Sequence, residues 1–317
     1  MSTSVGNVLL ADIGGTHARF ALLVGGRQQD IHTLDVGKYR SPEAAIAQFL
    51  KQHAPEGKLD RAVIAAAGPV SGNRCKLTNG TWVLDGSELE RAFGFTAVRL
   101  VNDLEALGWA VLHLGPGDVR AIGGGHVHAD APIAVIAPGT GLGMACVVPG
   151  REPRVLASEG GHAALAIGDE LEASVHAVLR RRHGHVSVER VLSGPGMQNL
   201  HSAVLELEGI ALRGLSAPEI SKAALAGDRH ARAALDLFCS LLGAVAGDMA
   251  LMFGARGGVY IGGGIVPVLV DYVAASDFRR RFESKGRLSP FLADIVTRVI
   301  MRPDPAFLGL AALAQLP

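Results

Sequence analysis

Two short glycine-rich loops are the segments of this sequence best suited to binding chemistry. The first runs Ala11-Asp12-Ile13-Gly14-Gly15-Thr16, and the second runs Pro138-Gly139-Thr140-Gly141-Leu142-Gly143. Each lies between two apolar runs typical of strands, so we predict a turn between two strands at both places. Glycine lets backbone N–H groups approach a ligand, and a concave row of N–H groups binds anions. The two loops together therefore predict a site for a chain of phosphates.

A carboxylate accompanies the first loop. Asp12 could hold Mg²⁺, directly or through water, next to bound phosphates. The alternative is a turn aspartate that accepts backbone N–H bonds. Neither loop has the strand-to-helix glycine pattern of dinucleotide sites, and neither has the lysine of a P-loop.

A second acidic position follows another predicted strand. Asn102 and Asp103 stand where that strand ends and a helix begins, which favours a helix N-cap. The functional alternative is a general base, because a carboxylate held near a hydroxyl can take its proton as the oxygen attacks phosphorus. The two roles are compatible.

Three further polar segments could line a site for a sugar. Glu159 and His162, joined by two glycines, can converge on vicinal hydroxyls, or they form a polar loop with a capping glutamate. Asn79 lies in a polar loop and could donate to a hydroxyl, although a solvated loop explains it equally well. Glu189, taken alone, would be a surface charge.

Two other patterns allow alternative interpretations. Gly262, Gly263 and Gly264 follow a buried strand, where close backbone approach could seat an adenine ring or serve tight helix–sheet packing. The histidine pairs at 126/128 and 183/185 resemble metal pairs, but no acidic partner is evident in the sequence, so metal binding is the weaker interpretation.

Composition limits the class of protein. The chain has 317 residues, 49% of them hydrophobic, which suits two domains better than one. The formal net charge is zero and no lysine–arginine block occurs, which argues against a nucleic-acid surface and a polybasic membrane anchor. The three cysteines are far apart, so a reducing, cytoplasmic setting is the simplest. The most membrane-like segment, 235–255, contains Asp236 and Asp248 and predicts a buried helix.

The predicted elements repeat one pattern, in which a hairpin is followed by strand–helix units. The expected strands are 8–11, 18–24, 29–34, 62–67, 97–101, 133–137, 144–148, 258–261 and 294–301. The expected helices are 42–53 (with Ser41 as N-cap), 103–113, 169–182, 196–207, 217–226, 230–253 and 305–316. We therefore predict an α/β protein of two related domains with mixed sheets flanked by helices. The expected domains are 1–112 with the C-terminal helix 303–317, and 113–302.

The ordered set of motifs resembles the bacterial ATP-dependent glucokinase family. Any one motif is weakly specific, but the set runs over nearly the whole chain in order. The shared segments are Leu10–Thr16, Leu77–Trp82, Val101–Asp103, Gly139–Gly143, Glu159–His162, Gly184–Ser187, Glu189–Gly196 and Gly262–Pro267.

The resemblance implies a fold, an activity and roles for residues. The fold would be a pair of actin-like (ribonuclease H-like) domains with the active-site cleft between them. The activity would be transfer of phosphate from ATP, with Mg²⁺, to the 6-hydroxyl of glucose, with Asp103 as the base. The resemblance also implies sugar contacts from Asn102, Glu159, His162 and Glu189, and it is consistent with a homodimer. It places the nucleotide on Ala11, Asp12, Ile13, Gly14, Gly15, Thr16, Gly139, Thr140, Gly141, Gly143 and Gly262–Gly264.

Two residues depart from the family pattern. His17 replaces the usual asparagine after Gly-Gly-Thr, and Pro138 stands where a small residue is more usual and removes one N–H donor. Both lie on the nucleotide side, so they bear on nucleotide affinity or donor choice rather than on the sugar.

Three rival functions follow from the same pattern. A kinase for another hexose or an amino sugar remains open. A non-catalytic sugar-sensing regulator would need a DNA-reading helix-turn-helix, whereas the first predicted strand already begins at Val8. An actin-like filament or chaperone ATPase would have no use for the sugar cluster.

Overall fold

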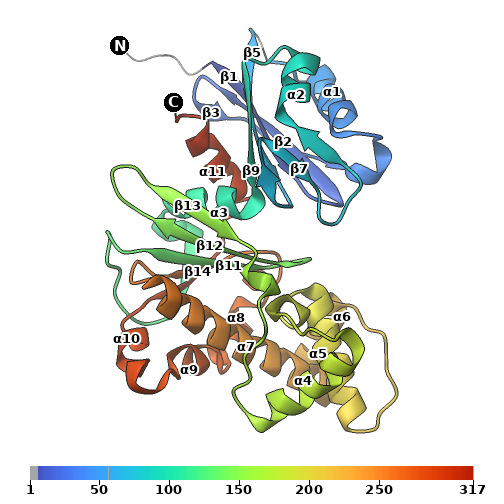
Figure 1. The fold of residues 1–317 in the computed structure, drawn as a ribbon, viewed down its shortest axis with the longest axis vertical. Helices are drawn as coiled ribbons and strands as arrows, with labels where there is room; N and C mark the ends of the chain where they lie inside the picture. Colours follow the sequence, from blue (N-terminus) through green and yellow to red (C-terminus); the bar gives the residue numbers. More distant parts are fainter. Residues whose placement is uncertain (1–5, 56, 317) are drawn as a thin grey trace. The chain divides into compact units, whose positions relative to one another are not determined.

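The computed structural model describes residues 6–55 and 57–316, which divide into two compact units (Figure 1). Unit 1 comprises the chain up to Leu114 together with the segment from Arg302 onward, and unit 2 is Gly115–Met301.

Unit 1 is built on a mixed six-stranded sheet. β1 (Asn7–Ile13) pairs antiparallel with β2 (His17–Val24) and parallel with β5 (Leu59–Ala66), which pairs parallel with β9 (Ala97–Asn102). The short strands β3 (Arg27–Gln28) and β4 (His32–Asp35) both pair with β2. The continuous strand predicted over 29–34 is therefore wrong, because β2 takes two successive partners.

Helices cover both faces of this sheet. α1 (Pro42–His53) and α2 (Gly86–Phe93) lie on one face, and α3 (Asp103–Val111) and α11 (Ala306–Leu313) lie on the other (Figure 1). Successive residues of β1 point to opposite faces of the sheet, and both faces are buried. The central run of β1 is therefore continuously apolar. Ser41 caps α1 through its side chain, and Pro42 is the first helical residue, as predicted.

Unit 1 contains a small second sheet that was not predicted from the sequence. β6 (Val70–Ser71), β7 (Arg74–Lys76) and β8 (Val83–Asp85) form a three-stranded antiparallel meander. These strands have two or three residues, too few to show a period of two.

Unit 2 repeats the arrangement of hairpin and parallel strands. β11 (Ile133–Pro138) pairs antiparallel with β12 (Leu142–Val148) and parallel with β14 (Val259–Ile261), which pairs parallel with β15 (Thr297–Ile300). The edges are β10 (Val119–Gly123) and β13 (Arg154–Ser158), neither of which was predicted. The mixed sheets flanked by helices confirm the predicted α/β class.

Most of the helical residues of unit 2 lie in four long helices, all predicted to within a few residues. They are α4 (Glu170–His183), α5 (Gly194–Leu207), α6 (Ala217–Leu225) and α7 (Arg229–Phe253). The short helices α8 (Val270–Ala275), α9 (Phe278–Glu283) and α10 (Ser289–Ala293) were missed. Single-turn 3₁₀ segments are η1 (Val36–Lys38), η2 (Pro116–Asp118), η3 (Gly160–His162), η4 (Val188–Arg190), η5 (Pro267–Leu269) and η6 (Gly286–Leu288).

The long helix α7 is the central helix of unit 2. By length and composition it could cross a membrane, but 67% of its most apolar window is buried inside the protein. It packs against α5, α6 and α9. A Cβ added at Gly243 would lie 2.1 Å from the Phe278 carbonyl oxygen, so glycine lets α9 contact the α7 backbone. This agrees with the buried helix predicted for the segment.

Candidate active site

The first glycine loop is a tight turn from β1 to β2. The Gly14 N–H donates to the His17 carbonyl within the turn, at 2.9 Å. A Cβ on Gly15 would lie 1.9 Å from the backbone oxygen of Asn79, so only glycine lets the two loops touch. The fold thus brings the predicted residue Asn79 beside the first loop.

Asp12, near the end of β1, forms an ion pair that was not predicted. Arg19 Nη1 donates to Asp12 Oδ2 at 3.2 Å, and Arg19 Nε lies 3.4 Å from Asp304 Oδ1. Burial raises the pKa of Asp12 above its ordinary value, and the Arg19 guanidinium offsets part of that effect. Hairpin register could have found this pair, because Arg19 stands directly opposite Asp12.

Asn102 joins β9 to α3. Its Oδ1 accepts from the Leu104 N–H at 2.9 Å, and its Nδ2 donates to the Gly68 carbonyl at 3.0 Å. The N-cap interpretation is therefore correct for Asn102. The amide nitrogen carries a second hydrogen that these bonds do not use.

Asp103 is the first residue of α3. Its Oδ1 accepts from the Leu104 N–H at 2.9 Å. The positive end of the helix dipole stabilises negative charge at this position. β1, β5 and β9 run parallel, so their carboxyl ends meet at one edge of the sheet. That edge gathers Asp12, Asn102 and Asp103 in unit 1, as expected for ligand sites in such sheets.

The second glycine loop joins β11 to β12 in unit 2, and its internal bonds determine which donors remain. The Gly139 N–H donates to the Gly141 carbonyl at 2.8 Å, and the Leu142 N–H donates to Glu189 Oε2 at 2.8 Å. Within the described chain, the N–H groups of Thr140 and Gly141 make no hydrogen bond. These two donors can therefore serve a phosphate.

Two of the three predicted glycines after β14, Gly262 and Gly263, lie against the end of β11, next to this loop. The Gly262 N–H donates to the Ile136 carbonyl at 2.8 Å. Gly263 has φ +80°, and a Cβ there would lie 2.1 Å from the Pro138 oxygen. Gly263 thus packs closely against the end of the strand β11, whereas the predicted alternative was packing of a helix on the sheet.

The remaining predicted residues of unit 2 also adjoin the second loop. Glu159 precedes η3 and His162 is its last residue; His162 Nε2 lies 3.8 Å from Glu159 Oε2, and both side chains are more than half exposed. A Cβ on Gly161 would lie 2.4 Å from the Leu142 oxygen, which places η3 against the loop. Glu189 belongs to η4, joined to η3 by the Val188 N–H bond to the Ala163 carbonyl. The Leu142–Glu189 bond was missed, and no local sequence signal indicates it.

The histidine pair at 126 and 128 has an acidic partner, contrary to the prediction. His126 Nδ1 lies 2.7 Å from Asp294 Oδ1, and His128 Nε2 lies 3.3 Å from Asp294 Oδ2. Arg256 also contacts His128 Nε2, at 2.8 Å. Among residues 6–55 and 57–316, no group of three or more His, Cys, Asp or Glu could hold a metal ion.

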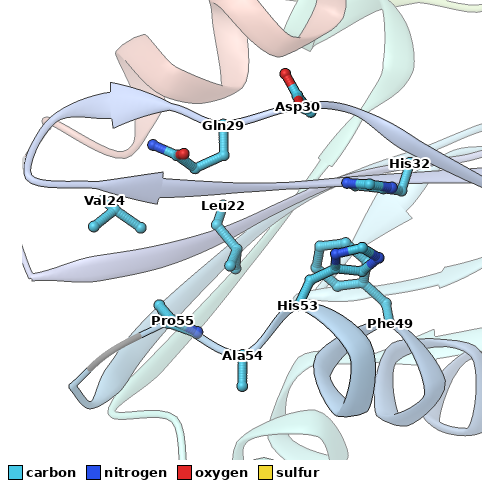
Figure 2. A pocket seen from close by; sticks show the side chains of 9 residues that line it. All are labelled: Leu22, Val24, Gln29, Asp30, His32, Phe49, His53, Ala54 and Pro55. Atoms are coloured by element: carbon cyan, nitrogen blue, oxygen red, sulfur yellow. The ribbon is translucent and has the colours of Figure 1, made fainter.

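A hollow of about 470 Å³ in unit 1 lies away from all these residues. It lies between the β2–β3 hairpin and the C-terminal end of α1, where the ring centroids of His32 and His53 lie 3.8 Å apart in a stacked pair (Figure 2). None of the predicted site residues lines it. The candidate site therefore rests on the loops and strand ends.

Comparison with known proteins agrees with the motifs. The glucokinase family model matches residues 9–317. The chain belongs to the glucokinase family. Its similarity to the glucokinase of Chromobacterium violaceum is 44% identity, over 96% of this chain and 88% of the relative. The glucokinase of Caulobacter sp. strain K31 is 42% identical over 99% and 96%.

Solved structures agree with this membership. A glucokinase from an Antarctic psychrotroph matches with TM-score 0.87 and 36% identity, covering 97% of this chain and 98% of that one. A Balamuthia mandrillaris glucokinase in complex with glucose matches with TM-score 0.81 at 22% identity, covering 99% and 95%, which shows the shared fold. Family membership supports ATP-dependent phosphorylation of glucose by this enzyme.

Proposed function

We propose that this glucokinase-family chain transfers the terminal phosphoryl group of ATP to the 6-hydroxyl of glucose, with Asp103 as the general base. The observation that carries the proposal is the position of Asp103. It stands at the N-terminus of α3, beside its N-cap Asn102 and at the edge where the parallel strands end. Asp103 takes the hydroxyl proton while the sugar oxygen attacks phosphorus.

The phosphates bind to backbone donors of the two loops. Gly15 and Thr16 supply N–H groups from the first loop, and Thr140 and Gly141 supply them from the second. The N-terminus of α5 lies beside the second loop, because the Gly194 N–H donates to the Gly139 carbonyl at 2.8 Å. The positive end of the α5 dipole therefore also favours phosphate there. The adenosine end lies along Gly262–Gly264.

Asp12 suits a magnesium ion carried by the nucleotide. Mg²⁺ in such enzymes takes one or two carboxylates together with phosphate oxygens and water. The ion pair with Arg19 uses one of the two carboxylate oxygens of Asp12, Oδ2. Asp12 would hold the ion directly or through water, and the bound ion offsets phosphate charge.

Side chains from both units bind the sugar. Asn79 and Asn102 belong to unit 1, and Glu159, His162 and Glu189 belong to unit 2. Carboxylates accept from sugar hydroxyls, and the asparagine amides both donate and accept. The enzyme acts in the cytoplasm, and a homodimer is the oligomer suggested by the resemblance.

Asp103→Asn tests the proposal. Turnover should fall about 10²–10⁴-fold, the typical contribution of a general base, while glucose still binds with little change. A coupled ADP-release assay measures turnover, and calorimetry measures sugar affinity. Near-normal turnover would defeat the assignment of Asp103.

A matrix of donors and acceptors tests the substrates. ATP, ADP and polyphosphate are each paired with glucose, mannose, fructose and glucosamine. We expect the highest kcat/KM for ATP with glucose. A higher value for another hexose would move the proposal to that sugar, and turnover without any hexose would end it.

A further inference from the structure

Glu189 makes a contact that sugar binding alone does not require. Its Oε2 accepts from the Leu142 N–H at 2.8 Å, joining η4 to the second glycine loop 47 residues earlier. The backbone of Glu189 is fixed as well, because its carbonyl accepts from Ser193 Oγ at 2.8 Å. The buried Ser193 hydroxyl thus fixes the backbone of Glu189, while the Glu189 carboxylate holds the second glycine loop.

The loop is held from the same segment at two points. The side chain of Glu189 holds Leu142, and the Gly194 N–H holds the Gly139 carbonyl at 2.8 Å. Between these points stand Thr140 and Gly141, whose N–H groups are the donors assigned to phosphate. A Cβ added at Gly141 would lie 2.7 Å from Glu189 Oε2, so the carboxylate packs directly against the turn.

We infer that Glu189 is a positioning residue for the phosphate loop and couples sugar binding to nucleotide binding. The inference rests on the proposed function, in which a sugar hydroxyl also bonds to this carboxylate. Oε2 fixes the turn, and the sugar occupies Oε1. A bound sugar restrains the side chain, so the nucleotide then meets a loop that is already ordered. Because the bound sugar has already ordered the loop, nucleotide binding no longer carries the entropy cost of ordering it. The two ligands therefore bind with positive coupling.

The coupling is measured as the affinity for AMPPNP with Mg²⁺, by calorimetry, with and without saturating glucose. For the wild-type protein we expect glucose to tighten AMPPNP binding about fivefold or more, the lower range of such couplings. Glu189→Ala should weaken AMPPNP binding severalfold even without sugar, because the Leu142 N–H loses its charged acceptor. Glu189→Gln keeps a carbonyl oxygen for that N–H and should recover much of the sugar-free affinity.

Two variants separate loop positioning from sugar binding. Glu159→Ala removes another proposed sugar carboxylate that has no bond to the loop. It should weaken glucose binding and leave sugar-free AMPPNP affinity unchanged. Gly141→Ala keeps Glu189 but displaces its carboxylate, and it should reproduce the weaker AMPPNP binding of Glu189→Ala.

The outcomes distinguish the inference from the proposed function. Wild-type affinity of Glu189→Ala for AMPPNP without sugar would overturn the inference and leave the proposed function standing. Failure of the wild-type protein to bind glucose or AMPPNP would overturn the proposed function itself. Thermal unfolding checks each variant, and if Glu189→Ala does not fold, Glu189→Gln and Gly141→Ala decide by the same comparison.

Discussion

Burial disfavours the charged form of the Asp12 carboxyl. Its folded-state pKa is raised above the unfolded value, chiefly by burial, so the folded protein resists ionisation of this group. Stability contributed by the protonated form is present below the unfolded pKa and is lost as pH rises through the folded pKa. Above its unfolded-state pKa this carboxyl therefore lowers the stability of the fold, a cost that accompanies the role proposed for Asp12.

Asp12→Asn should raise the Tm at pH 7 and lower turnover with Mg·ATP. The gain in Tm should shrink as pH falls through the raised folded-state pKa towards the unfolded value of 3.8, because the wild-type carboxyl then becomes protonated in the folded protein. Calorimetric scans between pH 4 and 8 measure the difference, with the exposed Asp30→Asn as the matched control. A Tm that drops at neutral pH would show that the ion pair with Arg19 outweighs the burial of the charge.

At the scale of elements, the sequence predicted the helices and strands whose start and end are determined by neighbouring residues. The Ser41-Pro42 cap, for example, begins α1 as expected. Most of the proposed site residues of each unit follow strands in recognisable motifs. The Leu142–Glu189 bond could not be predicted, since its partners are far apart and only tertiary folding joins them.

The contact between α3 and α11 is a further example that sequence does not reveal. A Cβ on Gly309 would lie 1.9 Å from the Ala106 carbonyl oxygen, so α11 lies directly on the helix that begins with Asp103. Gly309→Ala should force the helices apart and lower the free energy of unfolding by about 1–3 kcal/mol, as overpacking does. Turnover should fall too, because α3 carries the proposed base.

Urea unfolding and the coupled assay measure these effects. Gly117→Ala is the matched control, because a Cβ there meets no atom within 4 Å. It should change both quantities little. Equal stability of the two variants would contradict the close contact.

At the scale of the whole molecule, unit 1 depends on a segment remote in sequence. The chain leaves unit 1 after Leu114 and returns to it at Arg302. α11 then packs on α3, β1 and β5, and Arg61 Nη2 donates to the Ala314 carbonyl at 2.9 Å. The sheet face beneath α11 is covered only when the last residues are present.

Removing residues 302–317 should unfold unit 1 and leave unit 2 folded. Phe307, Leu310 and Leu313 are at most 2% exposed, and burying each such side chain contributes about 1.5–3 kcal/mol. Their sum rivals the total stability of a typical domain, about 5–15 kcal/mol. Turnover should be lost although every proposed site residue remains in the chain.

The two tryptophans make this prediction measurable unit by unit. Trp82 and Trp109 both belong to unit 1, so their fluorescence follows unit 1 alone, while far-UV circular dichroism follows both units. The truncated protein should show unfolded-type fluorescence together with a cooperative dichroism transition from unit 2. Leu310→Ala should lower the fluorescence midpoint and the unit 1 part of the dichroism transition, and the exposed Gln315→Ala should leave both in place. Native fluorescence in the truncated chain would mean that unit 1 folds without α11, and the dependence argued from its buried side chains would be wrong.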